Sequence, residues 1–246
     1  MHTQRSTPLM LALLAGLSVT GAAQAALIDR GGGLIYDTVL NVTWLQDANY
    51  AKTSGYHTTG LMNWTQATAW AANLSYYDSV RNVTYDDWRL PTMIDTGSSG
   101  CDFAYTGTDC GYNVQTYDGG TVYSELAYMY YVNLSNKGLH NTSGSSQSDY
   151  GLVDDPLNPN DESLFVNLLN YVYWSGLEYA PHVYYAWHFY TLSGYQYWDN
   201  KDIFSYAWAV RLGDVAAANN NPVPEPQTLA LLGLGLLGLA AARRRG

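Results

Sequence analysis

The chain has few positively charged residues. It contains 11 Lys and Arg against 21 Asp and Glu, a formal net charge of −10 at pH 7 with His neutral. Four of the 11 basic residues but only one of the 21 acidic residues lie in the two terminal segments, so the central part keeps seven basic and 20 acidic residues, a charge near −13. Such a surface repels the phosphates of nucleic acids and anionic lipids. The balance excludes nucleic acid as a partner and is compatible with cations or neutral sugars.

The sequence also lacks the motifs that mark common catalytic sites. Neither the zinc motif HExxH nor the nucleophile motif GxSxG occurs, and the Gly31-Gly32-Gly33 run is not part of a nucleotide-binding GxGxxG motif. No spacing among the acidic residues singles out a carboxylate pair of the glycosidase kind. We therefore expect a protein that is not an enzyme.

No apolar run is long enough to cross a bilayer squarely, but two shorter runs lie at the chain ends. The first, at residues 9–23, follows Arg5 and leads into the small-residue site Ala23-Gln24-Ala25. This order is typical of a secretory signal peptide, here residues 1–25, with cleavage between Ala25 and Ala26. We therefore expect the chain to be exported.

The second run belongs to a three-part C-terminal segment. The tetrapeptide Val223-Pro224-Glu225-Pro226 precedes an apolar run of about 15 residues, and the chain closes with the basic cluster Arg243, Arg244 and Arg245. Because proline breaks helices, the tetrapeptide is expected to be extended and open to a processing enzyme. The run is shorter than the roughly 20 residues of a full span, but bilayer thinning and arginine snorkelling absorb such a mismatch. The arginines are expected to stay on the cytoplasmic side.

This order of parts, at residues 223–246, resembles the PEP-CTERM sorting signal. The resemblance implies an exosortase as partner and transient anchoring in the inner membrane through a short C-terminal hydrophobic helix. The processed protein is then expected at the cell surface, on the outer membrane or in the extracellular matrix. An ordinary tail anchor is the alternative. Residues 215–222 are expected to form a mobile linker before the signal.

Cysteine is scarce, with Cys101 and Cys110 alone. Export favours a disulfide between them. The bridge would close a ten-residue loop and stabilise the fold by roughly 2–3 kcal/mol. Because no histidine lies in that loop, the pair makes a poor zinc site. We predict the disulfide.

Phenylalanine is rare, with four residues, whereas Tyr and Trp number 23 and eight. Tyr and Trp combine an apolar face with a polar edge, which suits half-wet surfaces and stacking on sugars. Two interpretations stay open. The favoured one is that aromatic side chains fill small β-sheets, and the other is a dedicated aromatic binding face.

The central residues 26–214 have the length of one domain. Helices are predicted at residues 63–74, with Asn63 and Gln66 as a capping box, and at 124–134. Residues 139–161 are expected to form a surface loop. Strands are predicted at residues 34–37, 41–45, 88–90, 171–175, 184–192 and 206–212. The pattern indicates an α+β domain with two helices and small antiparallel sheets.

Five short motifs follow one another in this domain: Trp44-Leu45-Gln46-Asp47-Ala48-Asn49-Tyr50, Asn63-Trp64-Thr65-Gln66-Ala67, Asp87-Trp88-Arg89-Leu90-Pro91-Thr92, Tyr173-Trp174-Ser175-Gly176 and Ala207-Trp208-Ala209-Val210-Arg211. The series resembles the Lcl C-terminal domain family over residues 27–214. The resemblance implies a C-type-lectin-like fold. We assign structural roles to the motif residues Trp88, Arg89, Leu90, Pro91, Trp174 and Arg211, and expect Arg89 to pair with a carboxylate such as Asp87 or Glu178.

One loop concentrates hard oxygen ligands of the kind that calcium prefers: Asp154, Asp155, Asn160 and Asp161. Asp199 and Asn200 offer two more. The spacing is not that of an EF-hand, so a solvated loop is the favoured interpretation and a calcium site the alternative. No other cofactor is expected.

These observations predict an exported, exosortase-sorted surface or matrix protein whose lectin-like domain binds a ligand. The aromatic surplus and the acidic surface make an exopolysaccharide the candidate partner. The alternative is a structural or adhesive surface protein without a small ligand.

Overall fold

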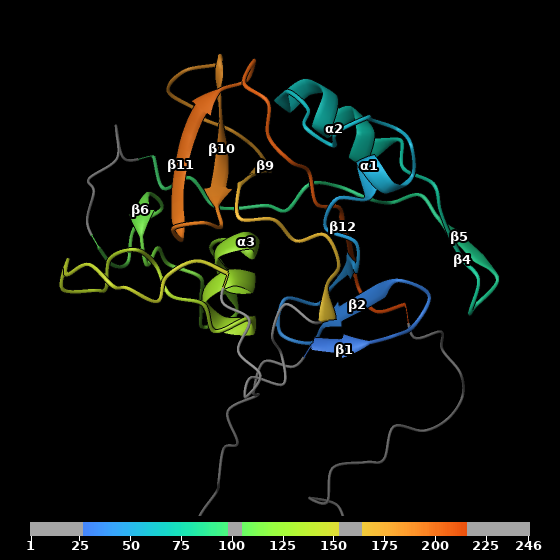
Figure 1. The fold of residues 1–246 in the computed structure, drawn as a ribbon, viewed down its shortest axis with the longest axis horizontal. Helices are drawn as coiled ribbons and strands as arrows, with labels where there is room; N and C mark the ends of the chain where they lie inside the picture. The colour runs from blue at the N-terminus through green and yellow to red at the C-terminus, as the bar shows by residue number, and fades with distance from the viewer. Residues whose placement is uncertain (1–26, 98–104, 153–163, 216–246) are drawn as a thin grey trace, which may run out of the picture.

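A computed structural model describes residues 27–97, 105–152 and 164–215 (Figure 1). Within these ranges the chain forms small antiparallel sheets and short helices, as the sequence predicts. The strands are β1 (Leu27–Asp29), β2 (Leu34–Asp37), β3 (Val42–Leu45), β4 (Tyr76–Asp78), β5 (Val83–Tyr85), β6 (Gly111–Tyr112), β7 (Tyr117–Asp118), β8 (Thr121–Val122), β9 (Val172–Glu178), β10 (Tyr185–Tyr190), β11 (Tyr195–Asn200) and β12 (Val210–Leu212).

The first sheet has the strand order β1-β2-β3-β12. Its centre is the predicted hairpin of β2 and β3, in which Asp37 pairs with Val42 and Leu34 with Leu45. Strand β1 adds to the β2 edge and β12 to the β3 edge. The predicted strand at 206–212 therefore begins only at Val210, because Tyr206 makes a single parallel bridge to Tyr173.

The second sheet has the order β6-β11-β10-β9. Strands β9 and β10 confirm two sequence predictions. Strand β11 was not predicted, although Tyr195, Tyr197 and Trp198 make it as aromatic as β10. The predicted strand at 88–90 was wrong, because Arg89 makes only an isolated bridge to Val210. Pro91 follows within two residues and cannot donate to a ladder.

Helix α2 (Trp64–Ala72) confirms the clearest helix prediction. The side chain of Asn63 accepts from Gln66 N at 2.8 Å, and the Gln66 side chain accepts from Asn63 N at 3.1 Å, so the capping box is complete. The helix ends at Ala72, two residues before the predicted end, where the Asn73 side chain donates to Ala69 O. Its buried residues are Ala67, Trp70 and Ala71.

The second predicted helix is split in two. Helix α3 (Glu125–Tyr128) is capped by Ser124, whose side chain accepts from Ala127 N. It continues directly as the π-helix η1 (Met129–Asn133), in which Leu134 N donates to Met129 O. Such π turns displace side chains from ordinary helical positions. The short helix α1 (Tyr50–Thr53) was not predicted.

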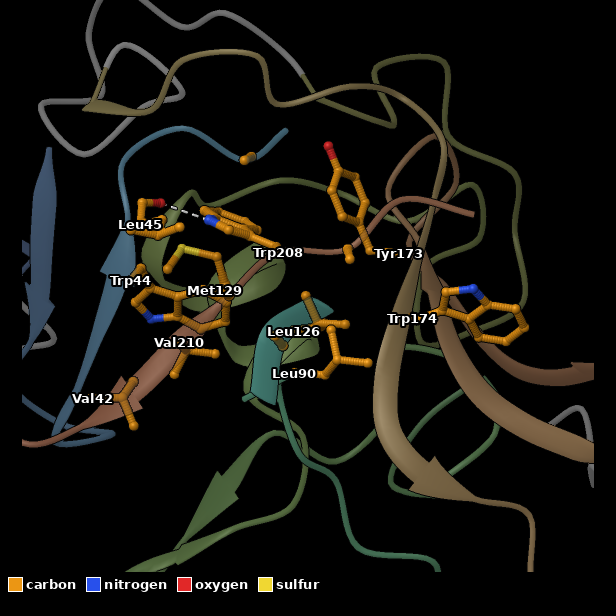
Figure 2. Close-up of a cluster of buried hydrophobic side chains, with 14 of the residues drawn as sticks. Val42, Trp44, Leu45, Leu90, Leu126, Met129, Tyr173, Trp174, Trp208 and Val210 are labelled. Carbon is orange, nitrogen blue, oxygen red and sulfur yellow. Dashed lines mark hydrogen bonds between the residues drawn. The ribbon is translucent and has the colours of Figure 1, made fainter. Parts of the chain in front are cut away.

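The core contains side chains from both sheets and from α3 (Figure 2). Trp44 and Trp208 pack at 4.7 Å between ring centroids, and Trp208 Nε1 donates to Leu45 O at 2.7 Å. Trp174 lies on β9, and its Nε1 donates to Met62 O at 2.9 Å. Large buried aromatics stabilise a fold most when such polar edges find a partner. Tryptophan therefore both fills the core and ties strands to loops.

Candidate functional site

A pocket of about 190 Å³ lies where the first sheet, helix α1 and strand β4 meet. It is lined by Gly33, Leu45, Gln46, Asp47, Tyr50, Tyr76 and Val166. Sites that enclose drug-sized ligands have volumes of roughly 300 Å³ or more. The pocket therefore fits one small unit of a ligand, such as a single ring, with the remainder outside.

The aromatic wall of the pocket depends on a glycine. Gly33 has φ +78°, and a Cβ atom there would lie 2.3 Å from Tyr76 Oη. Without that atom, the Tyr76 phenol reaches the glycine turn and donates to Gly32 O at 2.7 Å. Burial, and then the neighbouring Tyr50, raise the pKa of Tyr76, so it remains a neutral phenol at physiological pH. Tyr50 packs edge-on against it, with ring centroids 5.2 Å apart.

The polar side of the pocket is formed by Asp47. Its Oδ1 accepts from Asn49 N at 2.9 Å and from Asn167 Nδ2 at 3.0 Å. The backbone around Val166 holds this arrangement, because Ala48 N donates to Val166 O and Val166 N to Gln46 O. Asp47 thus has a fixed orientation although its chain segment is a turn.

Three oxygen atoms of the lining residues are left for a ligand. Asp47 Oδ2, Gln46 Oε1 and Tyr50 Oη take part in no hydrogen bond with any residue that the structure describes. Two of them are pure acceptors and the phenol can donate or accept. The lining residues therefore combine acceptor groups with aromatic rings, a composition that matches the hydroxyl groups and apolar face of a sugar.

The largest group of aromatic residues lies elsewhere and has another role. On the second sheet, Trp198 is sandwiched between Tyr179 and Tyr197, with centroid distances of 4.6 and 4.7 Å. Tyr195 stacks next to Tyr197 at 5.7 Å. The ring faces that stack on one another are thereby covered by neighbouring rings. Here the aromatic side chains fill a small sheet.

The motif residues assigned structural roles lie outside the pocket. Trp88, Leu90, Pro91 and Trp174 are buried. Arg89 binds Glu125 through two 2.7 Å hydrogen bonds, so neither Asp87 nor Glu178 is its partner. Asp87 instead pairs with Arg211, and Glu178 with Lys201. Glu125 is far from Arg89 in sequence, which is why local reasoning missed it.

The remaining candidate residues are only partly covered. Cys110 is buried, but Cys101 lies outside the described residues, so the disulfide stays a prediction. The calcium candidates Asp154, Asp155, Asn160 and Asp161 also lie outside them. Across residues 27–97, 105–152 and 164–215, no three His, Cys, Asp or Glu side chains gather as metal ligands. Asp199 and Asn200 lie at the end of β11, where the Asp199 side chain accepts from Asn200 N.

Sequence reasoning did not identify the pocket. Gln46, Asp47 and Tyr50 belong to one of the five motifs but had no role assigned to them, and Tyr76 was not considered. A polar, aromatic stretch directly after a buried strand was the one available signal. Gly33 and Val166 approach it only through tertiary packing.

Both terminal signals lie outside the described residues. In the part of the chain that the structure covers, no helix combines the length and apolar character needed to cross a bilayer. The sequence comparison bears on the C-terminal signal: residues 222–245 match the model of the PEP-CTERM protein-sorting motif. No curated protein and no solved structure matches the chain. The motif indicates exosortase-dependent export to the cell surface or the extracellular space.

Proposed function

We propose that the exported domain binds a polysaccharide by holding one sugar unit in the pocket of Asp47, Tyr50 and Tyr76. The observation that carries the proposal is a small pocket whose lining combines two tyrosines with Asp47 and Gln46, each of which has a side-chain oxygen without a hydrogen-bond partner among the described residues. Export to the cell surface brings this pocket to where polysaccharides are found. The small volume suits a chain that passes over the protein and inserts a single ring.

The charge of the pocket selects among polysaccharides. Asp47 forms no ion pair with any described residue, and the Gln46 oxygen lies in the same lining. An anionic sugar would bring a second negative charge against this carboxylate, in a domain already near −13. Neutral or amine-bearing sugars are therefore the expected ligands, and polyuronates are not.

We propose a binding role without catalysis. Hydrolysis of a glycosidic bond generally needs two carboxyl groups on either side of the bond. The pocket lining contains one, Asp47, and no histidine. The C-type-lectin-like fold implied by the five motifs also remains a proposal, supported by the small antiparallel sheets and the two predicted helical regions.

The experiment measures retention of the processed protein on immobilised neutral, amine-bearing and anionic polysaccharides. Tyr50→Ala removes an aromatic wall and is expected to weaken binding by about fivefold, because such stacking contributes about 1 kcal/mol. Asp47→Asn is expected to reduce the preference for amine-bearing over anionic chains, because it removes the carboxylate in the pocket lining. Tyr117→Ala, a partly exposed tyrosine of β7 outside the pocket, is the matched control.

A structural or adhesive role is the second candidate. The observation in its favour is the exposure of large apolar side chains, including Val183 at 64% and Tyr184 at 75% in the loop between β9 and β10. Isolated apolar residues are ordinary on protein surfaces, whereas contiguous patches mark interaction sites. Binding to other surface proteins but to no polysaccharide would favour this candidate over the first.

A further inference from the structure

Two segments of the chain are copies of one nine-residue unit. Residues 36–44 read Tyr-Asp-Thr-Val-Leu-Asn-Val-Thr-Trp, and residues 77–85 read Tyr-Asp-Ser-Val-Arg-Asn-Val-Thr-Tyr. Six of the nine positions are identical. The first copy forms the β2–β3 hairpin and the second forms the β4–β5 hairpin. The register is also the same, because Asp37 pairs with Val42 and Asp78 with Val83.

The two turns are built by the same hydrogen bonds. Oδ1 of Asp37 accepts from the backbone N–H groups two and three residues later, and so does Oδ1 of Asp78. The phenol of Tyr36 meets Asn41 Oδ1 at 2.9 Å, and that of Tyr77 meets Asn82 Oδ1 at 2.7 Å. Both asparagines have a left-handed backbone, with φ 52° and 55°. The unit is therefore a structural repeat as well as a sequence repeat.

The copies differ in what lies at their edges. In the first, β1 pairs with β2 and β12 pairs with β3. In the second, β4 and β5 form a two-stranded sheet, and no other described strand joins it. The second hairpin nevertheless contacts the turn of residues 30–33. Tyr76 Oη donates to Gly32 O, and the Arg81 side chain donates to Arg30 O. The β5 edge, which corresponds to the edge of β3 that β12 covers, is the open one.

The open edge is exposed and carries no net charge. Val83 is 43% exposed, Thr84 is exposed, and the hairpin projects from the body of the domain (Figure 1). Its two charged residues, Asp78 and Arg81, pair with each other at 2.7 Å. Elsewhere the central part of the chain is strongly acidic, near −13 overall. The hairpin itself therefore adds no net charge to the repulsion between two copies of this protein.

We propose that β5 pairs with β5 of a second copy of the chain, antiparallel and around a two-fold axis at Thr84. The second copy then takes the place that β12 has in the first hairpin. An antiparallel pairing of a strand with itself is self-complementary, as a two-fold interface requires. It places Val83 opposite Tyr85 of the second copy and the two Thr84 side chains opposite each other. Aromatic with β-branched pairs and Thr with Thr pairs are both favourable across antiparallel strands.

The contact is short, so the dimer is weak and depends on concentration. Short edges are one means by which proteins limit unwanted pairing. Export through a membrane-anchored sorting signal concentrates the chains at a surface, where a weak contact becomes populated.

The test is sedimentation velocity of the processed protein at concentrations up to the millimolar range. We expect a reversible monomer–dimer equilibrium. Thr84→Lys places two ammonium groups opposite each other on the axis and is expected to raise the dimer dissociation constant by about tenfold or more. Val183→Lys adds the same charge at an exposed valine in the β9–β10 loop and is expected to leave the constant unchanged.

A second variant decides the matter if Thr84→Lys does not fold. Thr84→Cys brings two thiols together across the proposed axis, so mild oxidation is expected to give covalent dimers, whereas Val183→Cys gives none. A protein that remains monomeric at every concentration, or equal effects of the paired variants at positions 84 and 183, would overturn the proposal.

Discussion

Asn133 Nδ2 donates a 2.6 Å hydrogen bond to the buried carboxylate of Asp37. The contact joins η1 to the first hairpin, and the π turn places Asn133 on this side of the helix. Asp37 has no ion-pair partner among the described residues, and Asn133 Oδ1 has no hydrogen-bond partner there. Burial raises the pKa of Asp37, against the lowering effect of its hydrogen bonds.

Asp37→Asn is expected to be tolerated and to change the pH dependence of folding. The folded-state pKa of Asp37 is raised. Its contribution to the free energy of unfolding is therefore fully present below the unfolded-state pKa of about 4, and it is lost as pH rises through the folded-state pKa. The variant has no such loss. If the Asn133 amide flips, its unpartnered oxygen accepts from the new amide. In urea unfolding, the stability of the variant relative to wild type should rise from acid to neutral pH.

Asp78→Asn is the matched control, because Asp78 has the same place in the second hairpin. Although burial opposes the shift, the hydrogen bond from Arg81 lowers the pKa of Asp78. The pH dependence is therefore opposite to that of Asp37. The contribution of Asp78 to the free energy of unfolding is present above the unfolded-state pKa and is lost on acidification. This variant should be less stable at neutral pH by about 1 kcal/mol. Parallel pH profiles for the two variants would refute the assignment.

His188 sets a second pH dependence. Burial lowers the pKa of His188 to about 4, although Asp199 opposes the shift. A folded pKa below the unfolded value of about 6.5 means that stability is lost as pH falls between these two values, by up to roughly 3 kcal/mol. His188→Phe should flatten that part of the profile, while the exposed His182→Gln should not. An unchanged acid slope in His188→Phe would show that other groups produce it.

Local sequence signals were reliable where an element is defined by its own residues. The Asn63–Gln66 capping box fixed the start of α2, and the turn after Asp37 fixed the β2–β3 hairpin. They were less informative where tertiary contacts decide. The π-helix η1 brings Asn133 to Asp37 of the first hairpin, and among the described residues the 88–90 segment makes one bridge, from Arg89 to Val210.

The candidate site shows the same division. Asp47 and Tyr50 are close in sequence and stand in a polar, aromatic stretch, so a reader could single them out. Gly33, Tyr76 and Val166 join them only through the folded arrangement of three separate segments. The hairpin repeat was present in the sequence throughout, but its period of 41 residues connects only nine positions, too few to stand out.

The Arg89–Glu125 pair should contribute more than surface pairs do. Glu125 is buried, and it also accepts from Thr92 N at 2.7 Å. Arg89→Met leaves that carboxylate without a cation and is expected to lower the free energy of unfolding by about 2 kcal/mol. The cost is less than for a fully buried pair because the Arg89 side chain is 36% exposed.

Lys137→Met provides the comparison, since Lys137 and Asp149 form a pair in which both side chains are more than half exposed. Its effect on thermal unfolding should be below about 0.5 kcal/mol. Equal losses of unfolding free energy in Arg89→Met and Lys137→Met would contradict the larger contribution expected of the Arg89–Glu125 pair. Glu125→Gln combined with Arg89→Met should recover part of the loss, because no unpaired charge is then buried.

The central claim is that a sugar unit enters the pocket of Asp47, Tyr50 and Tyr76. The most direct measurement is an NMR titration of the processed protein with an oligosaccharide cut from the polymer that binds best. The amide signals of Gly33, Asp47 and Val166 are expected to shift together and to saturate, and Tyr50→Ala is expected to remove these shifts. Saturable shifts confined to the β4–β5 hairpin or to the second sheet, or no shift with any oligosaccharide, would contradict the account.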